Sequence, residues 1–319
     1  MKPIRPFAFM LLAAALAACS GNSSNSSSSS SPGPAGSASK TIGVSIQDRE
    51  AQFYQQMENG MQSEANKYGY KLIVVDANRD NAKQQSQVED FISNKVDAIV
   101  LTPYDSTAIG SAIAEANKAN IPVFTADIAS TSKQGHVIAH IASDNVLGGQ
   151  QAGKLMCQAV GKTGYVAIID EPEVTSVQDR VKGFRDALKA NCPGVTVVAD
   201  VDAGGARDKA NQDMSDILQS NKNLSGVFGI NDDSALGALT AVRAAGLNGK
   251  VKVIGYDATP EARTAIASGD MYGDAIQYPD KIGALTIDTI HDFFTGKAPQ
   301  AVVHVNVGTY TQTDAKKAQ

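Results

Sequence analysis

The sequence predicts an α/β protein with two similar domains, each built on a mainly parallel sheet with helices on both faces. From residue 41 onward, short β-rich runs alternate with segments whose apolar residues recur every three or four positions. This alternation is typical of parallel sheets, in which a helix connects each strand to the next. It runs through one series and resumes after the segment HVIAHIASDN. Two series of similar length therefore favour two domains.

The first series has four expected strands: TIGVSI, KLIVVD, DAIVLT and IPVFTA. Two amphipathic helices are expected over 52–68 and 106–119, because their apolar residues fall on one helix face. The expected helix caps are Asn81, Asp105 with Ser106, and, at the carboxyl end of the first helix, Gly69.

The second series has five expected strands: GYVAIID, GVTVVADV, SGVFGI, KVKVIGY and MYGDAIQ. Helices are expected over 146–160, 177–191, 206–221, 232–244 and 259–268. A last helix at 280–295 and a strand at 301–307 remain, and the first domain, which has fewer strands, is the better candidate to receive them. The chain then crosses between the domains more than once, which predicts a hinge of several strands.

The amino terminus has the pattern of an export signal. Lys2 and Arg5 precede an unbroken apolar run over 7–18, too short to span a bilayer as a helix. The residues Leu16-Ala17-Ala18-Cys19 resemble a lipobox, which implies a signal peptide over 1–18 and lipid on Cys19. The alternative is an ordinary signal cleavage site beside an incidental cysteine. Residues 19–39 are rich in serine and predict a flexible tether, so the folded part lies outside the cytoplasm on a membrane surface.

Composition excludes several classes of function. The net charge is −5, and Lys and Arg are scattered, so we expect no nucleic-acid partner. No apolar run after the signal segment is long enough to span a membrane. Cys157 and Cys192 are the remaining cysteines; an exported compartment permits a disulfide between them, and two separate thiols are the alternative.

No motif in the sequence predicts an enzyme, a metal or a cofactor. The segment GGQQAGKL has the spacing of a phosphate loop, but Leu155 stands where the magnesium-binding Ser or Thr belongs. His136 and His140 lie on an expected strand, where residues four apart are separated by about 13 Å and do not share one ion. We find no catalytic triad in a suitable context and no paired carboxylates with an acid–base role.

Polar and aromatic residues follow the carboxyl ends of the expected strands, where ligands bind in parallel α/β sheets. Carboxylates, amides and a guanidinium suit pairs of neighbouring hydroxyls, and aromatic faces pack on sugar rings. Asp232, Asp233 and Ser234 are better interpreted as the start of a helix. The candidate residues are Gln47, Asp48, Phe53, Tyr54, Asp127, Arg180, Asn231, Asp257 and Gln277.

From about residue 41 to 307 the chain resembles the periplasmic ribose-binding protein family, the solute receptors of sugar ABC importers. The matching stretches are ANIPVFTAD, HIASDNVLGG, RVKGF, NDDSALGAL, VIGYDATPE and IQYPDKIGA. The resemblance implies two Rossmann-like lobes, a three-strand hinge and a sugar enclosed between the lobes. The lobes would comprise 40–143 plus 278–306, and 144–277 plus 307–319.

The resemblance also implies roles for the candidate residues. Phe53 and Tyr54 would be aromatic walls, and Asp127 would bind ring hydroxyls from the same lobe. The second lobe would contribute Arg180, Asn231 and Asp257, with Gln277 at a hinge. Gln47 and Asp48 are possible additional contacts.

Four positions depart from the family pattern. Ile128 stands where the family has an arginine, Ala51 where it has an asparagine, Gln47 where it has a serine, and Gly205 where it has an aromatic residue. Two donors and one stacking face are missing, which puts ribose in doubt as the ligand. A pyranose, a polyol and another small hydroxylated compound all stay open.

We therefore expect a monomeric, lipid-anchored solute receptor at the periplasmic or extracellular face of a membrane. Its partners would be a small carbohydrate and the permease of an ABC importer. The alternative is a sensor that presents its ligand to a membrane receptor kinase or chemoreceptor. A repressor that shares the fold, and an unrecognised hydrolase, are disfavoured.

Overall fold

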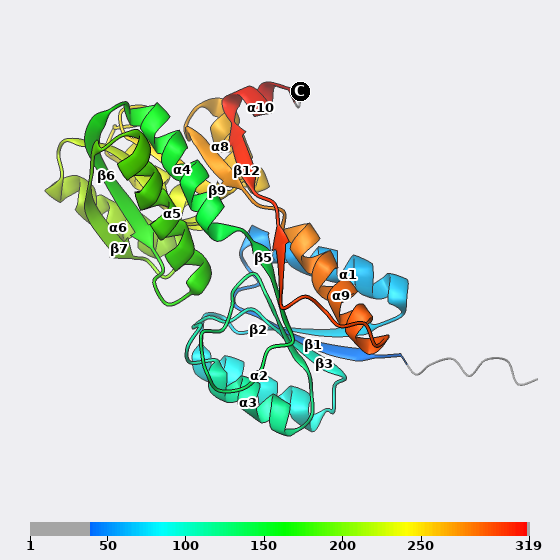
Figure 1. Cartoon of the computed structure of the whole chain (residues 1–319). Coiled ribbons are helices and arrows are strands. Elements are labelled where there is room, and N and C mark those ends of the chain that lie inside the picture. The colour runs from blue at the N-terminus through cyan, green and yellow to red at the C-terminus, as the bar shows by residue number, and fades with distance from the viewer. Residues whose placement is uncertain (1–38, 318–319) are drawn as a thin grey trace, which may run out of the picture. The chain divides into compact units, whose positions relative to one another are not determined.

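The structure, a computed structural model, describes residues 39–317. The expected signal peptide, Cys19 and the tether up to residue 38 lie outside the described residues. The described strands form two six-stranded sheets, ordered β11-β5-β4-β3-β1-β2 and β12-β10-β9-β8-β6-β7 (Figure 1). Helices cover both faces of each sheet, so the predicted pair of α/β lobes is confirmed.

The sheet of the first lobe is parallel throughout. Helices α1 and α9 lie side by side on one face, and α2 and α3 cover the other (Figure 1). On β1, Ile42, Val44 and Ile46 face α1 and α9, while the ring of Phe91 fills the space that Gly43 leaves on the other face. The elements are β1 (Thr41–Ile46), α1 (Gln52–Tyr68), β2 (Lys71–Asp76), α2 (Asn81–Ser93), β3 (Ala98–Leu101), α3 (Gly110–Lys118), β4 (Val123–Ala126), β5 (Ala139–Ser143), α9 (Pro279–Phe294) and β11 (Val302–Val305).

The sheet of the second lobe is parallel except at its edge, where β12 runs antiparallel to β10. Helices α4 and α5 pack on one face, and α6, α7 and α8 pack on the other. The elements are α4 (Asn145–Val160), β6 (Thr163–Asp170), α5 (Thr175–Asn191), β7 (Gly194–Asp202), α6 (Arg207–Ser220), β8 (Leu224–Gly229), α7 (Asp232–Ala244), β9 (Lys252–Asp257), α8 (Pro260–Ser268), β10 (Gly273–Ile276), β12 (Gly308–Thr311) and α10 (Gln312–Lys317).

The chain passes from one lobe to the other in three short segments. The first joins β5 to α4, the second joins β10 to α9, and the third joins β11 to β12. The strand expected over 301–307 is β11, and a further strand that the sequence analysis did not predict, β12, follows it in the other sheet. This arrangement confirms the three-strand hinge. Because the three segments are short, few backbone torsion angles connect one lobe to the other.

Two predicted helix caps and one predicted helix start were wrong. Asp80 rather than Asn81 caps α2, because its side chain accepts a hydrogen bond from Lys83 N at 3.0 Å. Helix α3 begins at Gly110 rather than 106, because Asp105 accepts from Thr107 N and Ala108 N and holds the preceding residues in a turn. The third error, at Asp232, concerns the candidate site and is described there.

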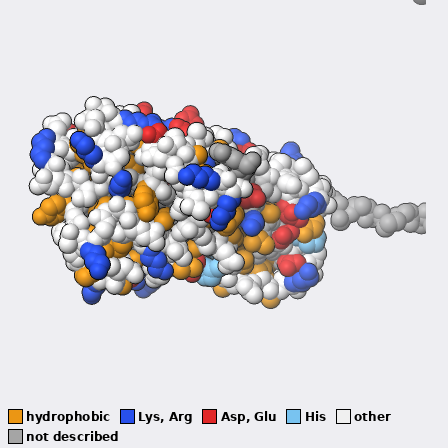
Figure 2. Space-filling model, turned by 90° about the horizontal axis from the view of Figure 1, so that it is seen from above, with side chains coloured by type: hydrophobic (Ala, Val, Ile, Leu, Met, Phe, Trp, Pro, Cys, Tyr) orange, Lys and Arg blue, Asp and Glu red, His pale blue; other side chains and the backbone are white. Residues whose placement is uncertain are grey.

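Neither a membrane-crossing helix within residues 39–317 nor, on the face shown in Figure 2, a basic stripe is present. Among residues 39–317, no helix combines the length and apolar character that crossing a bilayer requires. On the face shown in Figure 2, Lys and Arg side chains are scattered and Asp and Glu side chains lie among them. On this face, positive charge is not concentrated in one patch.

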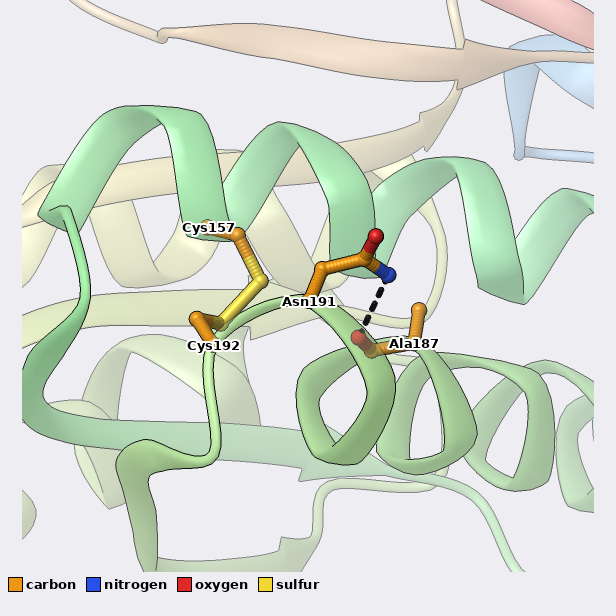
Figure 3. The surroundings of a disulfide bond; sticks show 4 residues. All are labelled: Cys157, Ala187, Asn191 and Cys192. Atoms are coloured by element: carbon orange, nitrogen blue, oxygen red, sulfur yellow. Dashed lines mark hydrogen bonds between the residues drawn. A yellow bond between two sulfur atoms is a disulfide. The ribbon is translucent and has the colours of Figure 1, made fainter.

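Cys157 and Cys192 form a disulfide in the structure, the arrangement that the sequence left open (Figure 3). Their Cα atoms are 5.7 Å apart, within the range that a cystine spans. The bond joins α4 to the carboxyl end of α5, two helices that share one face of the second sheet. Beside it, Asn191 donates a side-chain hydrogen bond to the carbonyl of Ala187 at 2.8 Å.

We expect Cys157→Ser/Cys192→Ser to lower the free energy of unfolding by about 2–4 kcal/mol, because the bond restricts the unfolded chain. Urea unfolding of oxidised wild type and variant measures the difference. Asn191→Ala is the control, and it should cost less because it removes one local hydrogen bond. Equal unfolding midpoints for wild type and double variant would refute this prediction.

Candidate functional site

The carboxyl ends of strands from both sheets surround one cavity of about 560 Å³, which includes solvent space at its mouth. This is the region in which ligands of parallel α/β proteins bind. Eight of the nine candidate residues line it: Gln47, Phe53, Tyr54, Asp127, Arg180, Asn231, Asp257 and Gln277. Asp48 is the exception, because it lines a neighbouring outer groove and pairs with Arg79.

The first lobe contributes two aromatic rings and a carboxylate. Phe53 and Tyr54, at the start of α1, meet edge to face with 5.1 Å between ring centroids. The hydroxyl of Tyr54 donates to Gln47 Oε1 at 2.7 Å and lies 3.3 Å from Asp127 Oδ2. Asp127 follows β4 with a φ of 65°, a left-handed conformation that its backbone hydrogen bond to Ile141 O maintains.

The second lobe contributes Arg180, a guanidinium that is 4% exposed. It donates to Asn145 Oδ1 at 2.8 Å and to the carbonyl of Ile230 at 3.0 Å. It also lies over the ring of Tyr256, 4.1 Å from its centroid. These contacts leave Nη2 4.0 Å from Asp127 Oδ1 of the other lobe, so opposite charges face each other across the cavity.

Asp257 and Gln277 complete the second-lobe side. Asp257 ends β9 with a φ of 118°, a strained conformation of the kind that is common at binding sites. Its Oδ1 accepts from Gln277 Nε2 at 2.7 Å, and its Oδ2 lies 3.4 Å from the backbone nitrogen of Asp232. Burial and the nearby Asp232 carboxylate raise the pKa of Asp257 well above its usual range.

Besides Asp232 Oδ1, which lies near Gly255, three buried acceptor atoms of residues that line the cavity have no hydrogen-bond partner among the described residues. They are Asp127 Oδ1, Gln277 Oε1 and Gln52 Oε1. Buried polar atoms are nearly always hydrogen-bonded, and leaving one unpaired costs about 1–3 kcal/mol. Ligand hydroxyls would donate to all three atoms, so the arrangement fits a polyhydroxylated molecule.

Sequence reasoning missed Gln52, Arg79 and Glu171, which also line the cavity. Glu171 directly follows β6, and Arg79 lies three residues after β2. The strand-end rule that selected the other candidates also points to both. Burial raises the pKa of Glu171 to about 7, against the opposing effects of Arg79 and a hydrogen bond from Gln47.

Asp232 is not the helix cap that the sequence predicted. The cap of α7 is Asn231, whose Oδ1 accepts from Ser234 N at 2.8 Å. Several adjacent residues are able to cap this helix, and the first of them takes the position. Asn231 also donates to the carbonyl of Gly205 at 3.1 Å. Asp232 instead points into the lobe, where its Oδ2 accepts from Thr259 N at 2.7 Å.

Asp232 and Asp274 form a buried carboxyl pair behind Asp257. The two residues are 2% and 0% exposed, respectively. They meet at Gly255, where a Cβ would overlap an oxygen of Asp274 and lie 2.8 Å from an oxygen of Asp232. Burial raises the pKa of Asp274 to about 7, and burial with the neighbouring Asp274 raises that of Asp232 well above its usual range. Burial and mutual repulsion therefore both favour protonation of this pair.

The raised pKa of Asp274 predicts that stability falls with increasing pH. The stabilising contribution of protonated Asp274 is complete at pH values below the ordinary pKa of Asp. It is lost as the pH rises through about 7, because the unfolded state binds fewer protons than the folded state. We expect Asp274→Asn, which supplies a neutral donor of the same shape, to show a shallower fall between pH 5.5 and 8.5. Urea unfolding at both values measures it.

The exposed Asp186→Asn is the control for this series, because its side chain pairs only with Lys182 on the surface of α5. Glu171 titrates in the same direction, so Asp274→Asn should reduce the pH dependence without abolishing it. A pH dependence identical in wild type and Asp274→Asn would contradict the raised pKa of Asp274.

The described part of the chain offers no metal centre, since residues 39–317 contain no group of three or more His, Cys, Asp or Glu side chains placed to hold an ion. His140 lies on β5, but His136 precedes the strand. The pKa of His140 is lowered to about 4 by burial, so this imidazole is neutral at physiological pH.

Comparison with known proteins gives a family match over most of the chain. Residues 42–298 match the family described as periplasmic binding protein domain. The ribose import binding protein of Haemophilus influenzae is 34% identical over 274 residues, which cover 86% of this chain and 92% of that protein.

Solved structures of similar proteins support the same family match. An ABC transporter periplasmic solute-binding protein from Actinobacillus succinogenes with bound D-allose has a TM-score of 0.81 and 31% identity, covering 87% of this chain and 99% of that one. The Caulobacter myo-inositol binding protein with bound myo-inositol has a TM-score of 0.81 and 30% identity, covering 87% and 95%.

Proposed function

The chain belongs to the periplasmic binding protein family, among the solute-binding proteins of sugar and polyol ABC importers, and we propose that it encloses one small sugar or polyol between its lobes. The relatives are binding proteins rather than enzymes. Two of the relatives named above are binding proteins of import or ABC transport systems, so the sensor considered as the alternative is not favoured. The bound solute would be delivered to the permease of an importer by a monomeric receptor.

The unpartnered acceptors in the cavity carry this proposal. Asp127 Oδ1 comes from the first lobe, and Gln277 Oε1 lies at the hinge. Arg180 and Asp257 of the second lobe line the same cavity. A molecule with several hydroxyl groups would satisfy groups from both lobes at once, which favours the closed arrangement.

The ligand class is inferred from the aromatic rings in the cavity lining and from the absence of an arginine at position 128. Ile128 is 1% exposed and lines the cavity at a position where the related family has an arginine. The relatives named above bind ribose, D-allose or myo-inositol. We infer a neutral pyranose or cyclic polyol rather than ribose, with Phe53 and Tyr54 against its C–H face.

The binding prediction concerns Asp127 and Asp257. Each substitution to Ala should weaken binding roughly tenfold to a hundredfold, because ligand hydroxyls lose a buried partner worth about 1–3 kcal/mol. Thermal-shift screening of pentoses, hexoses and inositols first identifies a ligand. Calorimetry then measures affinity, since the chain has no Trp for fluorescence.

Asp186→Ala is the matched control, because it removes an exposed carboxylate from the helix that carries Arg180. It should leave the affinity unchanged. If Asp127→Ala and Asp257→Ala bind the identified ligand as tightly as wild type, the assignment of these residues to the site is wrong.

We also propose that Cys19 carries a lipid that attaches the protein to a membrane surface. The support is the sequence Leu16-Ala17-Ala18-Cys19 followed by the serine-rich segment. Wild type expressed in bacteria should incorporate a labelled fatty acid, and Cys19→Ser should not. Equal labelling of the two proteins would exclude this anchor, and Cys157→Ser/Cys192→Ser controls for labelling at the other cysteines.

A further inference from the structure

The two lobes contact each other directly at the cavity, through hydrogen bonds between side chains of different lobes. Gln47, after β1, donates through Nε2 to Oε1 of Glu171, after β6, at 2.6 Å. These residues are 2% and 4% exposed. A short, buried hydrogen bond to a carboxylate thus joins loops from different sheets.

Arg79 strengthens the same junction. Its Nη1 lies 3.6 Å from Glu171 Oε1, and its guanidinium donates to the carbonyls of Gly204 and Gly205 in the second lobe. Asp48, which belongs to the same lobe as Arg79, accepts a hydrogen bond through Oδ2 from Arg79 Nε at 3.0 Å. Gly205 leaves the necessary space, because a Cβ there would lie 2.5 Å from Glu171 Oε2 and 3.1 Å from Arg79 Nη1.

A second junction lies at the start of α5. Ser106, which the sequence assigned to the start of α3, instead accepts a hydrogen bond through Oγ from Thr175 N of the other lobe at 3.0 Å. Its own backbone nitrogen donates to the carbonyl of Glu173 at 3.1 Å. Helix α5 has no side-chain cap from its own lobe at Val174. One of its free amide groups is therefore satisfied only by the first lobe.

We propose that Arg79, Ser106 and Glu171 are positioning residues that stabilise the closed form of the binding site through contacts between the lobes rather than with the solute. The three residues, with Gln47, are called the cross-lobe latch below. Opening the hinge would separate Gln47 and Arg79 from Glu171 and return the amide of Thr175 to water.

In each lobe, the cross-lobe latch also contacts a proposed ligand-binding residue or the helix that carries one. Gln47 Oε1 accepts from Tyr54, which lies against Asp127, and Ser106 satisfies the first turn of the helix that carries Arg180. A contact that favours the closed form raises the apparent affinity for every solute by the same factor, because it raises the fraction of closed molecules.

Small-angle scattering without any sugar tests the latch. We expect Arg79→Ala/Glu171→Ala and Ser106→Ala each to give a larger radius of gyration than wild type, because fewer molecules are closed. Matched controls remove contacts within a lobe: Arg185→Ala breaks the ion pair with Asp200, and Asp80→Ala removes the cap of α2. Identical scattering from wild type and both latch variants would overturn the proposal.

The affinity measurement rests on the proposed function and separates the latch from ligand contacts. D-ribose, D-allose and myo-inositol are the probes, and calorimetry should show roughly tenfold weaker binding of every probe that wild type binds. A loss confined to one probe would show that these residues contact the solute, and would also overturn the proposal. If no probe binds wild type, the proposed ligand class fails, while scattering still decides the latch.

Discussion

The site depends on one buried charge, the guanidinium of Arg180. A buried cation is tolerated only when hydrogen-bond partners surround it, and Asn145, the carbonyl of Ile230 and the ring of Tyr256 supply them. The helix that carries it is fixed along its length. At Gly149 of α4 a side chain would overlap the carbonyl oxygen of Arg180, so the two helices are in backbone contact there, and the disulfide joins their other ends. Rigid support of this kind keeps the guanidinium directed at the cavity.

The carboxylates around the cavity have fewer hydrogen-bond partners than the guanidinium of Arg180. Asp127 approaches Arg180 only at 4.0 Å, and burial raises its pKa despite that neighbour. Its Oδ1 lacks a donor within the described chain. A hydroxyl donor at this point would favour the ionised form of Asp127. The energetic gain on binding a polyhydroxylated molecule is thus greatest where the protein leaves its own acceptors unpaired.

The sequence was sufficient for the architecture because parallel α/β folds follow from local patterns. The apolar alternation of β1 and the spacing of Phe53, Met57 and Met61 on α1 are visible in a single segment. Contacts between lobes have no such signature. Ser106 looks like a local cap and acts on α5, while Asp232 looks like a cap and lies in a buried pair. In both cases the deciding partner is distant in the sequence.

Closure of the lobes must also remain reversible, and the exposure of the latch is suited to that requirement. Gln47 and Glu171 are buried, but the side chain of Arg79 is 21% exposed, so water and salt weaken its attraction to Glu171. Burial also favours the neutral form of Glu171, whose pKa is about 7. A fully buried ion pair would hold an empty protein shut and hinder solute entry. A partly solvated pair favours closure while leaving the solute hydroxyls to complete it.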